Sequence, residues 1–246
     1  MSDKSSCGII YLMSILAEYA RAFGIELSPA QIDALELYQR ELVVWNQRVN
    51  LTTITARDEI VVKHFLDSLS VALALPASMV SLIDVGSGAG FPGVPLKIAF
   101  PTVRVTLLEA TGKKIEFLKH IITQLALSDI RAIHGRAEEL ARDAKHRQKY
   151  AVAVGRAVAE LPTLLEYAMP FVRVGGVFIA QKGVDVDEEV HRAERAIKEL
   201  GGQLNAVIPV QLPGLGPRHL IVVKKIAATP DKYPRSAGAP KKKPLL

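Results

Sequence analysis

The chain has 246 residues, of which 49% are hydrophobic and 23% charged, and its formal net charge is +6. This composition suffices for a folded core in one or two domains and excludes a predominantly disordered chain. A single cysteine, Cys7, excludes an internal disulfide framework and favours a reducing compartment, which we expect to be the cytoplasm. The apolar run 9–17 is too short to span a bilayer and lacks a convincing cleavage site, so we expect no membrane association.

Residues 1–80 are predicted to form a helical N-terminal region. Ser28-Pro29-Ala30-Gln31 is typical of a capping box that opens a helix. A second helix is expected over 55–73, with His64 and Asp67 on the side opposite its apolar face. Their spacing alone favours a solvated helix face with local charge pairs.

Residues 81–226 are predicted to form one α/β domain. Its strand candidates are 81–86, 103–109, 130–134, 150–156, 175–181, 204–210 and 218–225. Its helix candidates are 93–100, 112–126, 136–147, 159–171 and 186–200. Such alternation predicts a Rossmann-like, mostly parallel seven-stranded sheet with helices on both faces. Because no helix separates the last two strands, they are expected to form a hairpin with one antiparallel strand.

The strongest local signal is a glycine-rich turn after the first strand, within the segment 84–93 (Asp-Val-Gly-Ser-Gly-Ala-Gly-Phe-Pro-Gly). Gly86 lets a ligand approach the main chain, and the following helix N-terminus favours negative charge. Glu109 ends the second strand at about the spacing at which an acid accepts hydrogen bonds from ribose hydroxyls. The pattern therefore predicts a nucleotide-type cofactor site.

S-adenosylmethionine is the cofactor that the spacing favours. A dinucleotide fingerprint would need a small residue where Phe91 stands. The sequence Gly112-Lys113-Lys114 lacks the earlier glycine and the Ser or Thr of a phosphate-binding loop. A merely tight turn is the remaining alternative.

Ligands of such sheets bind outside the carboxyl ends of the strands, where Gly86, Glu109, Arg156 and Lys182 are expected to meet. For Arg156 and Lys182 the alternative is a plain surface charge. Glu138 follows the third strand, where it is a candidate for an adenine contact or simply a favourable acid at a helix N-terminus.

Residues 227–246 are expected to be a basic, flexible tail. The segment from Lys224 onward carries a net charge of +6, whereas the rest of the chain is balanced. Lys241-Lys242-Lys243 is compatible with a solubilising, disordered end and equally with nucleic-acid contact.

Several ordered motifs together carry a family resemblance. They are Lys63-His64-Phe65-Leu66-Asp67-Ser68-Leu69, the segment 84–93, Leu96-Lys97-Ile98, Glu109-Ala110-Thr111-Gly112-Lys113-Lys114, Gly135-Arg136-Ala137-Glu138, Gly155-Arg156-Ala157 and Gln181-Lys182-Gly183. Between about residues 45 and 225 the chain resembles the bacterial ribosomal RNA small subunit methyltransferase G family, also called RsmG or GidB.

This resemblance implies a class I methyltransferase fold and methyl transfer from S-adenosylmethionine to N7 of one guanine in 16S rRNA. It implies cofactor contacts at Gly86, Phe91, Glu109, Ala110, Thr111, Ala137, Glu138 and Arg156. The expected partner is 16S rRNA or a small-subunit ribosomal particle, and no metal site is expected. Catalytic residues are unassigned, with His64, Arg156 and Lys182 as candidates on the substrate side.

Guanine N7 carries an in-plane lone pair and no proton, so its methylation requires alignment but no general base. Arg156 or a main-chain group is a candidate for holding the guanine by O6. Two other classes stay open: a methyltransferase for a small molecule or a protein, and a noncatalytic RNA-binding factor for ribosome assembly.

Overall fold

The computed structural model describes residues 15–77, 79–183 and 186–246. Cys7 and most of the apolar run 9–17 lie outside the described residues. In the described part of the chain, no helix is both long enough and apolar enough to cross a membrane.

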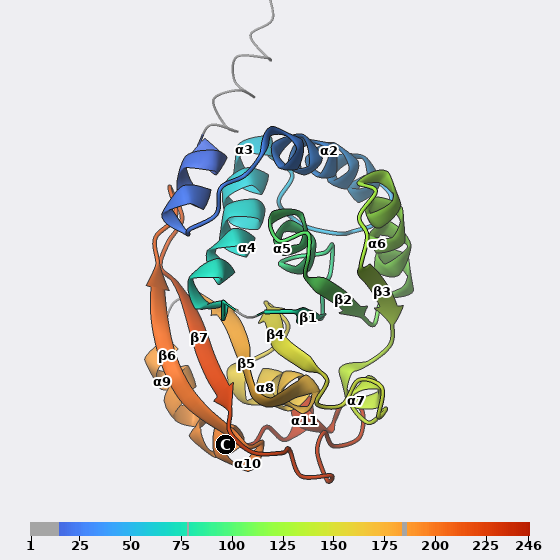
Figure 1. Cartoon of the computed structure of the whole chain (residues 1–246). Coiled ribbons are helices and arrows are strands. Elements are labelled where there is room, and N and C mark those ends of the chain that lie inside the picture. The colour runs from blue at the N-terminus through green and yellow to red at the C-terminus, as the bar shows by residue number, and fades with distance from the viewer. Residues whose placement is uncertain (1–14, 78, 184–185) are drawn as a thin grey trace, which may run out of the picture.

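A seven-stranded sheet forms the centre of the molecule, with the strand order β3-β2-β1-β4-β5-β7-β6 (Figure 1). The strands are β1 Ser81–Val85, β2 Arg104–Glu109, β3 Ile130–His134, β4 Tyr150–Arg156, β5 Val172–Lys182, β6 Gly202–Val210 and β7 Arg218–Lys225. The first five run parallel, whereas β7 is antiparallel to both β5 and β6. This architecture confirms the expected α/β fold and its antiparallel hairpin.

Helices cover both faces of the sheet because the central strands are apolar on both sides. On one face lie α2 Pro29–Asn46, α5 Gly93–Ala99 and α6 Gly112–Gln124, which share one apolar core with the N-terminal region. On the other lie α8 Leu161–Ala168, α9 Val186–Arg192 and α10 Glu194–Glu199 around a second core. The short helix α7 spans only Ala137–Leu140, although the sequence predicts helix over 136–147.

The N-terminal region begins with helical residues 15–22 and continues into α2. Ser28 caps α2 as predicted: its hydroxyl accepts from Gln31 N, and the Gln31 side chain accepts from Ser28 N. Gln31 Nε2 also donates to Ile98 O at 2.6 Å, which joins the start of α2 to the end of α5. The capping box therefore fixes both the helix and its position over the sheet.

The helix expected over 55–73 forms as one run of changing pitch. It consists of α3 Arg57–Ile60, a π-helical turn Val61–Leu66, α4 Asp67–Leu69 and a 3₁₀ turn Ser70–Ala74. The predicted solvated face is wrong, because His64 and Asp67 are only 6% and 5% exposed. The run packs against α5, and its last turn contacts β5, β6 and β7, so side chains on more than one of its sides are covered (Figure 1). The π turn lies where His64 enters the site, a setting in which such turns are frequent.

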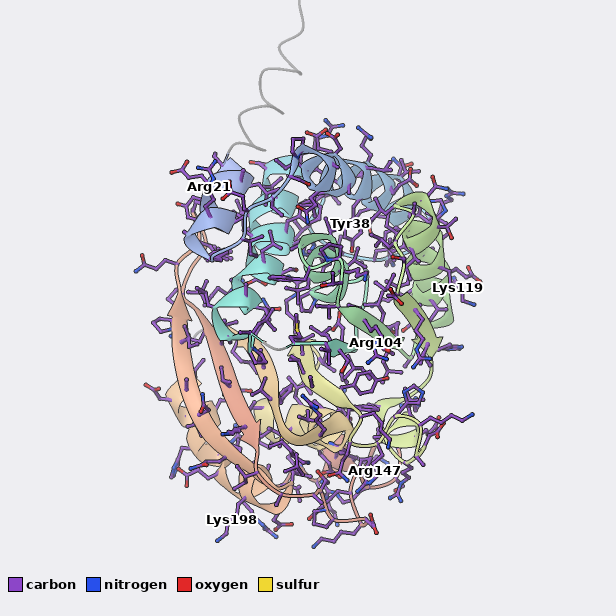
Figure 2. The ribbon with its side chains drawn as sticks, viewed as in Figure 1. Arg21, Tyr38, Arg104, Lys119, Arg147 and Lys198 are labelled. Carbon is purple, nitrogen blue, oxygen red and sulfur yellow. The ribbon has the colours of Figure 1, made fainter. Side chains whose placement is uncertain are left out.

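The C-terminal segment 227–246 differs from the expected flexible tail. It packs under α8 and ends in a short helix, α11 Ala239–Lys242 (Figure 1). Arg147, labelled in Figure 2, donates to the carbonyls of Thr229, Pro230 and Tyr233. Arg235 forms a bidentate pair with the fully buried Glu166. The charge count does not reveal this packing, because it depends on partners far away in the sequence.

Candidate cofactor and substrate site

The glycine-rich turn follows β1 and enters α5 at close range. Gly86 has φ +76°, a conformation that favours glycine. A Cβ on Gly93 would lie 2.8 Å from Asp84 Oδ2 and 2.3 Å from Leu107 Cδ2. Gly93 N donates to Asp84 Oδ2 at 2.9 Å, so the helix begins directly on the buried strand. The turn thus leaves its main chain open on the side of the cavity.

Glu109 ends β2 beside this turn, as predicted. Its side chain is 7% exposed, and its two oxygens accept from Gly88 N at 2.9 Å and Thr111 N at 2.8 Å. A carboxylate has about four acceptor sites, so two remain for ligand hydroxyls. Glu109 therefore holds the turn and still suits the ribose of a nucleoside.

A cavity of about 380 Å³, here called the cofactor cavity, lies at these strand ends. Its walls include five of the predicted cofactor residues: Gly86, Phe91, Glu109, Ala110 and Arg156. Thr111 contributes its main-chain N–H to Glu109 and does not line the cavity.

Ala137 and Glu138 are not brought to this cavity. Glu138 is buried, and its Oε1 accepts from Gly238 N of the C-terminal segment at 3.0 Å. The C-terminal segment thus occupies one oxygen of the Glu138 carboxylate, a contact that sequence spacing does not reveal.

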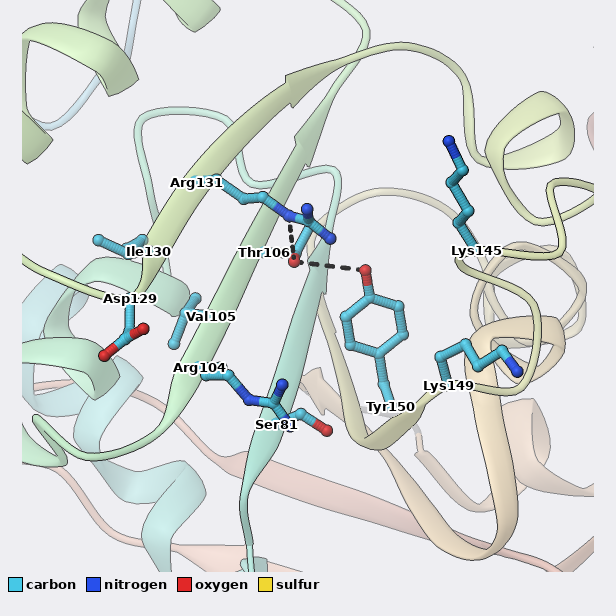
Figure 3. A pocket seen from close by; sticks show the side chains of 10 residues that line it. All are labelled: Ser81, Arg104, Val105, Thr106, Asp129, Ile130, Arg131, Lys145, Lys149 and Tyr150. Atoms are coloured by element: carbon cyan, nitrogen blue, oxygen red, sulfur yellow. Dashed lines mark hydrogen bonds between the residues drawn. The ribbon is translucent and has the colours of Figure 1, made fainter.

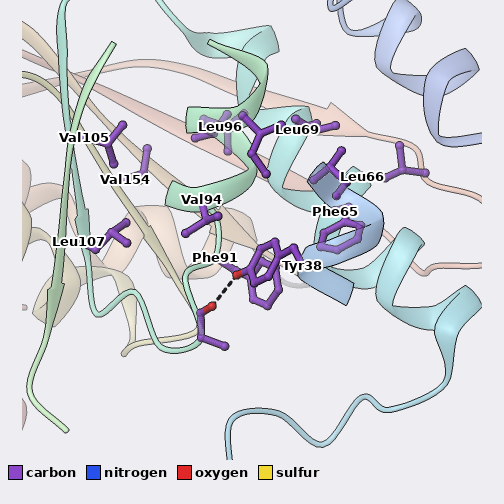
Figure 4. Packing of buried hydrophobic residues seen from close by; sticks show 14 of the residues in the cluster. Tyr38, Phe65, Leu66, Leu69, Phe91, Val94, Leu96, Val105, Leu107 and Val154 are labelled. Atoms are coloured by element: carbon purple, nitrogen blue, oxygen red, sulfur yellow. Dashed lines mark hydrogen bonds between the residues drawn. The ribbon is translucent and has the colours of Figure 1, made fainter. Parts of the chain in front are cut away.

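Phe91 is the centre of a stack of rings and charge at the floor of the cavity. The His64 ring lies parallel to it, with centroids 4.3 Å apart, and Tyr38 stacks at 5.3 Å. The Arg156 guanidinium is 5.0 Å from the Phe91 centroid. Tyr38 also donates to Ala89 O at 2.5 Å, so α2 anchors the glycine turn (Figure 4).

Arg156 ends β4 and is not the plain surface charge that was the alternative. Its Nη1 donates to Asp67 Oδ2 at 2.9 Å and to Lys63 O at 3.1 Å, and its side chain is 15% exposed. Asp67 Oδ1 also lies 3.6 Å from Arg218 Nε. Asp67 therefore balances two cations at the rim.

Lys182 ends β5 and is similarly held. Its Nζ donates to Glu189 Oε1 at 2.6 Å and to Ala159 O at 2.9 Å. Lys182 lines a second cavity of about 450 Å³, here called the substrate cavity. The two cavities adjoin, because Thr52, His64, Arg156 and Ala157 line both.

Burial sets the protonation of the acids and bases at this site. Desolvation, aided by the Arg156 charge, lowers the pKa of His64 to about 3, so the imidazole is neutral at pH 7. Desolvation raises the pKa of Asp84 to about 7 despite its hydrogen bond from Gly93. Desolvation also raises the pKa of Tyr38, which therefore remains a hydrogen-bond donor. None of these groups is placed as an ionised base on the substrate side.

Sequence reasoning missed several residues of this site as functional candidates, among them Thr52, Asp67 and Gln181. Thr52 lines both cavities, while Asp67 and Gln181 lie at the substrate cavity. Asp67 and Gln181 belong to the quoted family motifs, which was the available signal. Thr52 lies in none of them, and its place depends on the fold of the loop after α2.

A cationic cavity of about 400 Å³ lies at the amino ends of strands β1 to β4 (Figure 3). Ser81, Arg104, Ile130 and Tyr150, which begin β1 to β4, line it. Four cations surround it: Arg104, Arg131, Lys145 and Lys149, against the single acid Asp129. At its floor Arg131 Nε and Tyr150 OH both donate to Thr106 Oγ1. Within residues 15–77, 79–183 and 186–246, no group of three or more metal-ligating side chains gathers.

The sheet order, the glycine turn after β1 and the acid at the end of β2 define a class I S-adenosylmethionine-dependent methyltransferase. The structure of a ribosomal protein L11 methylase from Lactobacillus delbrueckii subsp. bulgaricus shares this fold, with TM-score 0.51 and 15% identity over 67% of this chain and 79% of that one. TrmN from Thermus thermophilus also has TM-score 0.51, with 16% identity over 68% of this chain and 53% of that one.

The family model for rRNA small subunit methyltransferase G matches residues 31–220. Ribosomal RNA small subunit methyltransferase G of Roseiflexus castenholzii is 50% identical over 95% of this chain and 100% of its own length. The protein of the same name from Chloroflexus aggregans is 48% identical over 94% of this chain and 97% of its own. The chain belongs to this family, and the expected enzyme class and cofactor are confirmed.

Proposed function

We propose that this enzyme transfers a methyl group from S-adenosylmethionine to N7 of one guanine in 16S rRNA. The observation that carries the proposal is the pair of adjoining cavities that share one wall. One cavity suits a nucleoside cofactor, and the other admits a nucleobase from the solvent side. The reacting atoms would meet at the wall formed by Thr52, His64 and Arg156.

The cofactor cavity fits S-adenosylmethionine in its residue chemistry. Glu109 keeps acceptor sites for ribose hydroxyls, and Gly86 permits close approach to the main chain. When bound, the cofactor supplies a methyl group on a positively charged sulfur. The chain's own part is to hold and orient that group, with Phe91 and Arg156 forming the cavity floor.

The substrate cavity suits an acceptor that has no proton to lose. His64 is neutral, and both its nitrogens are already within hydrogen-bond distance of Thr52 and Arg156. Asp67 is paired with Arg156. An exocyclic amine would usually need a base here, whereas guanine N7 needs only an aligned lone pair. Alignment and fixed dipoles therefore account for the reaction.

A polyanionic partner agrees with the distribution of charge. The cationic cavity at the amino ends of the strands and the exposed Lys241, Lys242 and Lys243 both suit RNA phosphates. We propose 16S rRNA, naked or within a small-subunit particle, as the substrate, and hence the cytoplasm as the place of action.

The test is mass-spectrometric mapping of methylated guanines in rRNA from cells with and without this protein. The expected result is one guanine that is methylated in cells with the protein and unmethylated in the deletion strain. Borohydride and aniline treatment should cleave the RNA at this guanine only when the protein is present. Methylated but uncleavable RNA would exclude N7. Methyl transfer only to metabolites or proteins would show that RNA is not the substrate. RNA binding without release of S-adenosylhomocysteine would indicate a noncatalytic assembly factor. Purified rRNA and small subunits, assayed side by side, identify the form that is methylated.

A further inference from the structure

One hydroxyl on the wall shared by the two cavities is rigidly placed. Thr52 lies in the loop after α2, and the Asn46 amide at the end of that helix holds the loop. Asn46 Oδ1 accepts from Leu51 N at 2.8 Å and Thr52 N at 3.0 Å, while Asn46 Nδ2 donates to Thr52 O at 2.9 Å. The main chain at Thr52 is therefore held to the end of α2.

The hydrogen bonds around His64 determine the role of the Thr52 hydroxyl. A guanidinium only donates, so the 3.2 Å contact from Arg156 Nη2 makes His64 Nδ1 an acceptor. The proton of the neutral ring is then on Nε2, which donates to Thr52 Oγ1 at 2.8 Å. Ile54 N donates to the same oxygen at 3.1 Å. Both lone pairs of Thr52 Oγ1 are thus used, and its own hydrogen has no acceptor in the described part of the chain.

Gln181, which lines the substrate cavity, carries an acceptor with no donor among the described residues. Gln181 precedes the last residue of β5, is 5% exposed and donates from Nε2 to Asp67 O at 2.6 Å. This bond fixes the orientation of the amide, because a carbonyl oxygen accepts only from the nitrogen end. Gln181 Oε1 is buried and has no hydrogen-bond partner among the described residues. A buried acceptor without a partner is destabilising, and a donor on a bound ligand would remove that cost.

We propose that Thr52 and Gln181 together recognise the target base as guanine: the Thr52 hydroxyl donates to O6, and Gln181 Oε1 accepts from N1–H. This assignment rests on the proposed function. Along the edge of guanine, N7, O6 and N1 follow in that order, and N7 must lie at the wall where the cavities meet. Thr52 lines both cavities, whereas Gln181 lines only the substrate cavity. The order of the protein groups therefore matches the order of the base atoms.

The same pair of groups disfavours adenine. Adenine has an amino donor at position 6 and an acceptor at N1, so each protein group would face a group of its own kind. Sites built to hydrogen-bond a substrate reject analogues that leave their polar groups unpaired. A neutral hydroxyl also suits the reaction, because it adds no positive charge beside the ring that becomes cationic. Arg156, the candidate for O6 from the sequence, commits both Nη1 hydrogens to Lys63 O and Asp67.

The test combines protein variants with a substrate in which the mapped target guanine is replaced by 2-aminopurine. This base keeps N7 but lacks both O6 and N1–H. Single-turnover methyl transfer by the full chain is measured at saturating S-adenosylmethionine. Thr52→Val and Gln181→Leu should each slow transfer to guanine by about 10–100-fold, because each removes one hydrogen bond to the base. Thr52→Val also removes the acceptor for His64 Nε2 and Ile54 N, and Gln181→Leu removes the donor to Asp67 O. With 2-aminopurine the wild type should be slow, and the two variants should lose less than about 3-fold more, since the partners are already absent.

Matched controls separate recognition from folding. Thr52→Ser keeps the hydroxyl and should stay near wild type. Thr123→Val removes an exposed hydroxyl on α6 that bonds only Lys119 O, and it should have no effect. Calorimetry should show unchanged S-adenosylmethionine affinity for Gln181→Leu, because Gln181 lines the substrate cavity and not the cofactor cavity.

Three results would overturn the assignment. The first is wild-type transfer to 2-aminopurine as fast as to guanine. The second is a variant that slows transfer to 2-aminopurine by the same factor as transfer to guanine. The third is a loss of cofactor affinity in Gln181→Leu. If Thr52→Val does not fold, two measurements still test the assignment. They are the wild-type rates with guanine and with 2-aminopurine, and the effect of Gln181→Leu on each of these rates. Failure of the proposed function is distinct, because the wild type would then leave no N7-methylguanine in unmodified rRNA.

Discussion

Gly86 and Glu109 are the residues on which the cofactor cavity depends. A Cβ at Gly86 would lie 2.7 Å from Val158 Cγ2 in a backbone conformation that side chains rarely adopt. Glu109→Ala removes the ribose acceptor and frees two main-chain N–H groups. We expect Gly86→Val and Glu109→Ala each to weaken S-adenosylmethionine binding by about 10–100-fold, measured by calorimetry. The exposed Glu116→Ala on α6 serves as the control, and unchanged affinity in both folded variants would remove this site.

Asp84 lies beneath the glycine turn and makes the stability of the folded protein depend on pH. Burial raises its pKa to about 7, whereas an unfolded Asp titrates near ~3.9. The folded protein therefore retains a proton that the unfolded chain has lost. The contribution of Asp84 to the free energy of unfolding is full below pH ~4, falls as the pH rises to about 7 and then stays constant.

Asp84→Asn should remove this fall. The difference in unfolding free energy between variant and wild type should then grow in favour of the variant from pH 4 to 7, measured by urea unfolding at several pH values. Asp33→Asn, an exposed carboxyl on α2, should give a flat difference. A flat difference for Asp84→Asn as well would show that Asp84 ionises normally in the folded state.

At the scale of elements, segment 227–246 combines a packed portion with three exposed lysines. Deleting 236–246 would also remove the contact of Gly238 N with Glu138 and that of Pro240 O with Thr163. Replacing Lys241, Lys242 and Lys243 by alanine is therefore the more specific test, because it removes the charges and keeps these packing contacts. If these lysines contact phosphates, RNA affinity should fall about equally across sequences, and the slope of log K against log salt should flatten by up to ~2 units.

Fluorescence titration over a salt series measures that slope. Alanine at the exposed Lys198, Lys224 and Lys232 removes the same charge elsewhere and is the control. If the slope does not change in the Lys241–Lys243 variant, these lysines do not contact RNA phosphates and serve only as solvated surface charges.

The elements that could be predicted are those whose signals are local in sequence. Spacing was enough for the alternation of strands and helices, because each element carries its own pattern of apolar residues. It was enough for the capping box at Ser28 and for the pattern from Gly86 to Glu109, because the residues of each lie close together in the sequence. The burial of His64 and Asp67 was not predictable, because it depends on contacts such as Gln181 Nε2 to Asp67 O across 114 residues. The contact of Glu138 with Gly238 spans 100 residues and was missed for the same reason.

At the scale of the whole molecule, the two cavities and the neutral His64 bear on how the rate depends on pH. An N7 acceptor loses no proton, so no general base should shape the rate. We expect single-turnover methyl transfer at saturating cofactor to stay nearly flat between about pH 6 and 8.5. Asp84 titrates within this range, but it lies under the turn and faces Gly93 N, so its ionisation should affect stability and not the chemical step.

Rapid-quench assays across that range provide the measurement. His64→Gln and Asp67→Asn are the informative variants, and each should keep a flat profile even where its rate is lower. A basic limb that disappears in either variant would identify a general base and argue against N7.

The pairing of Glu166 with Arg235 has a consequence for the order in which the chain matures. Glu166 is 0% exposed, and a buried carboxylate without its partner is strongly destabilising. Its guanidinium partner comes 69 residues later, and ribosomes extend a chain by about 5–20 residues per second. The face that contains the glycine turn draws its core from residues up to and including Leu220, whereas the α8 face also needs Tyr233 and Leu245. During synthesis the cofactor side of the sheet can therefore close first, and the α8 side waits until Tyr233, Arg235 and Leu245 have emerged.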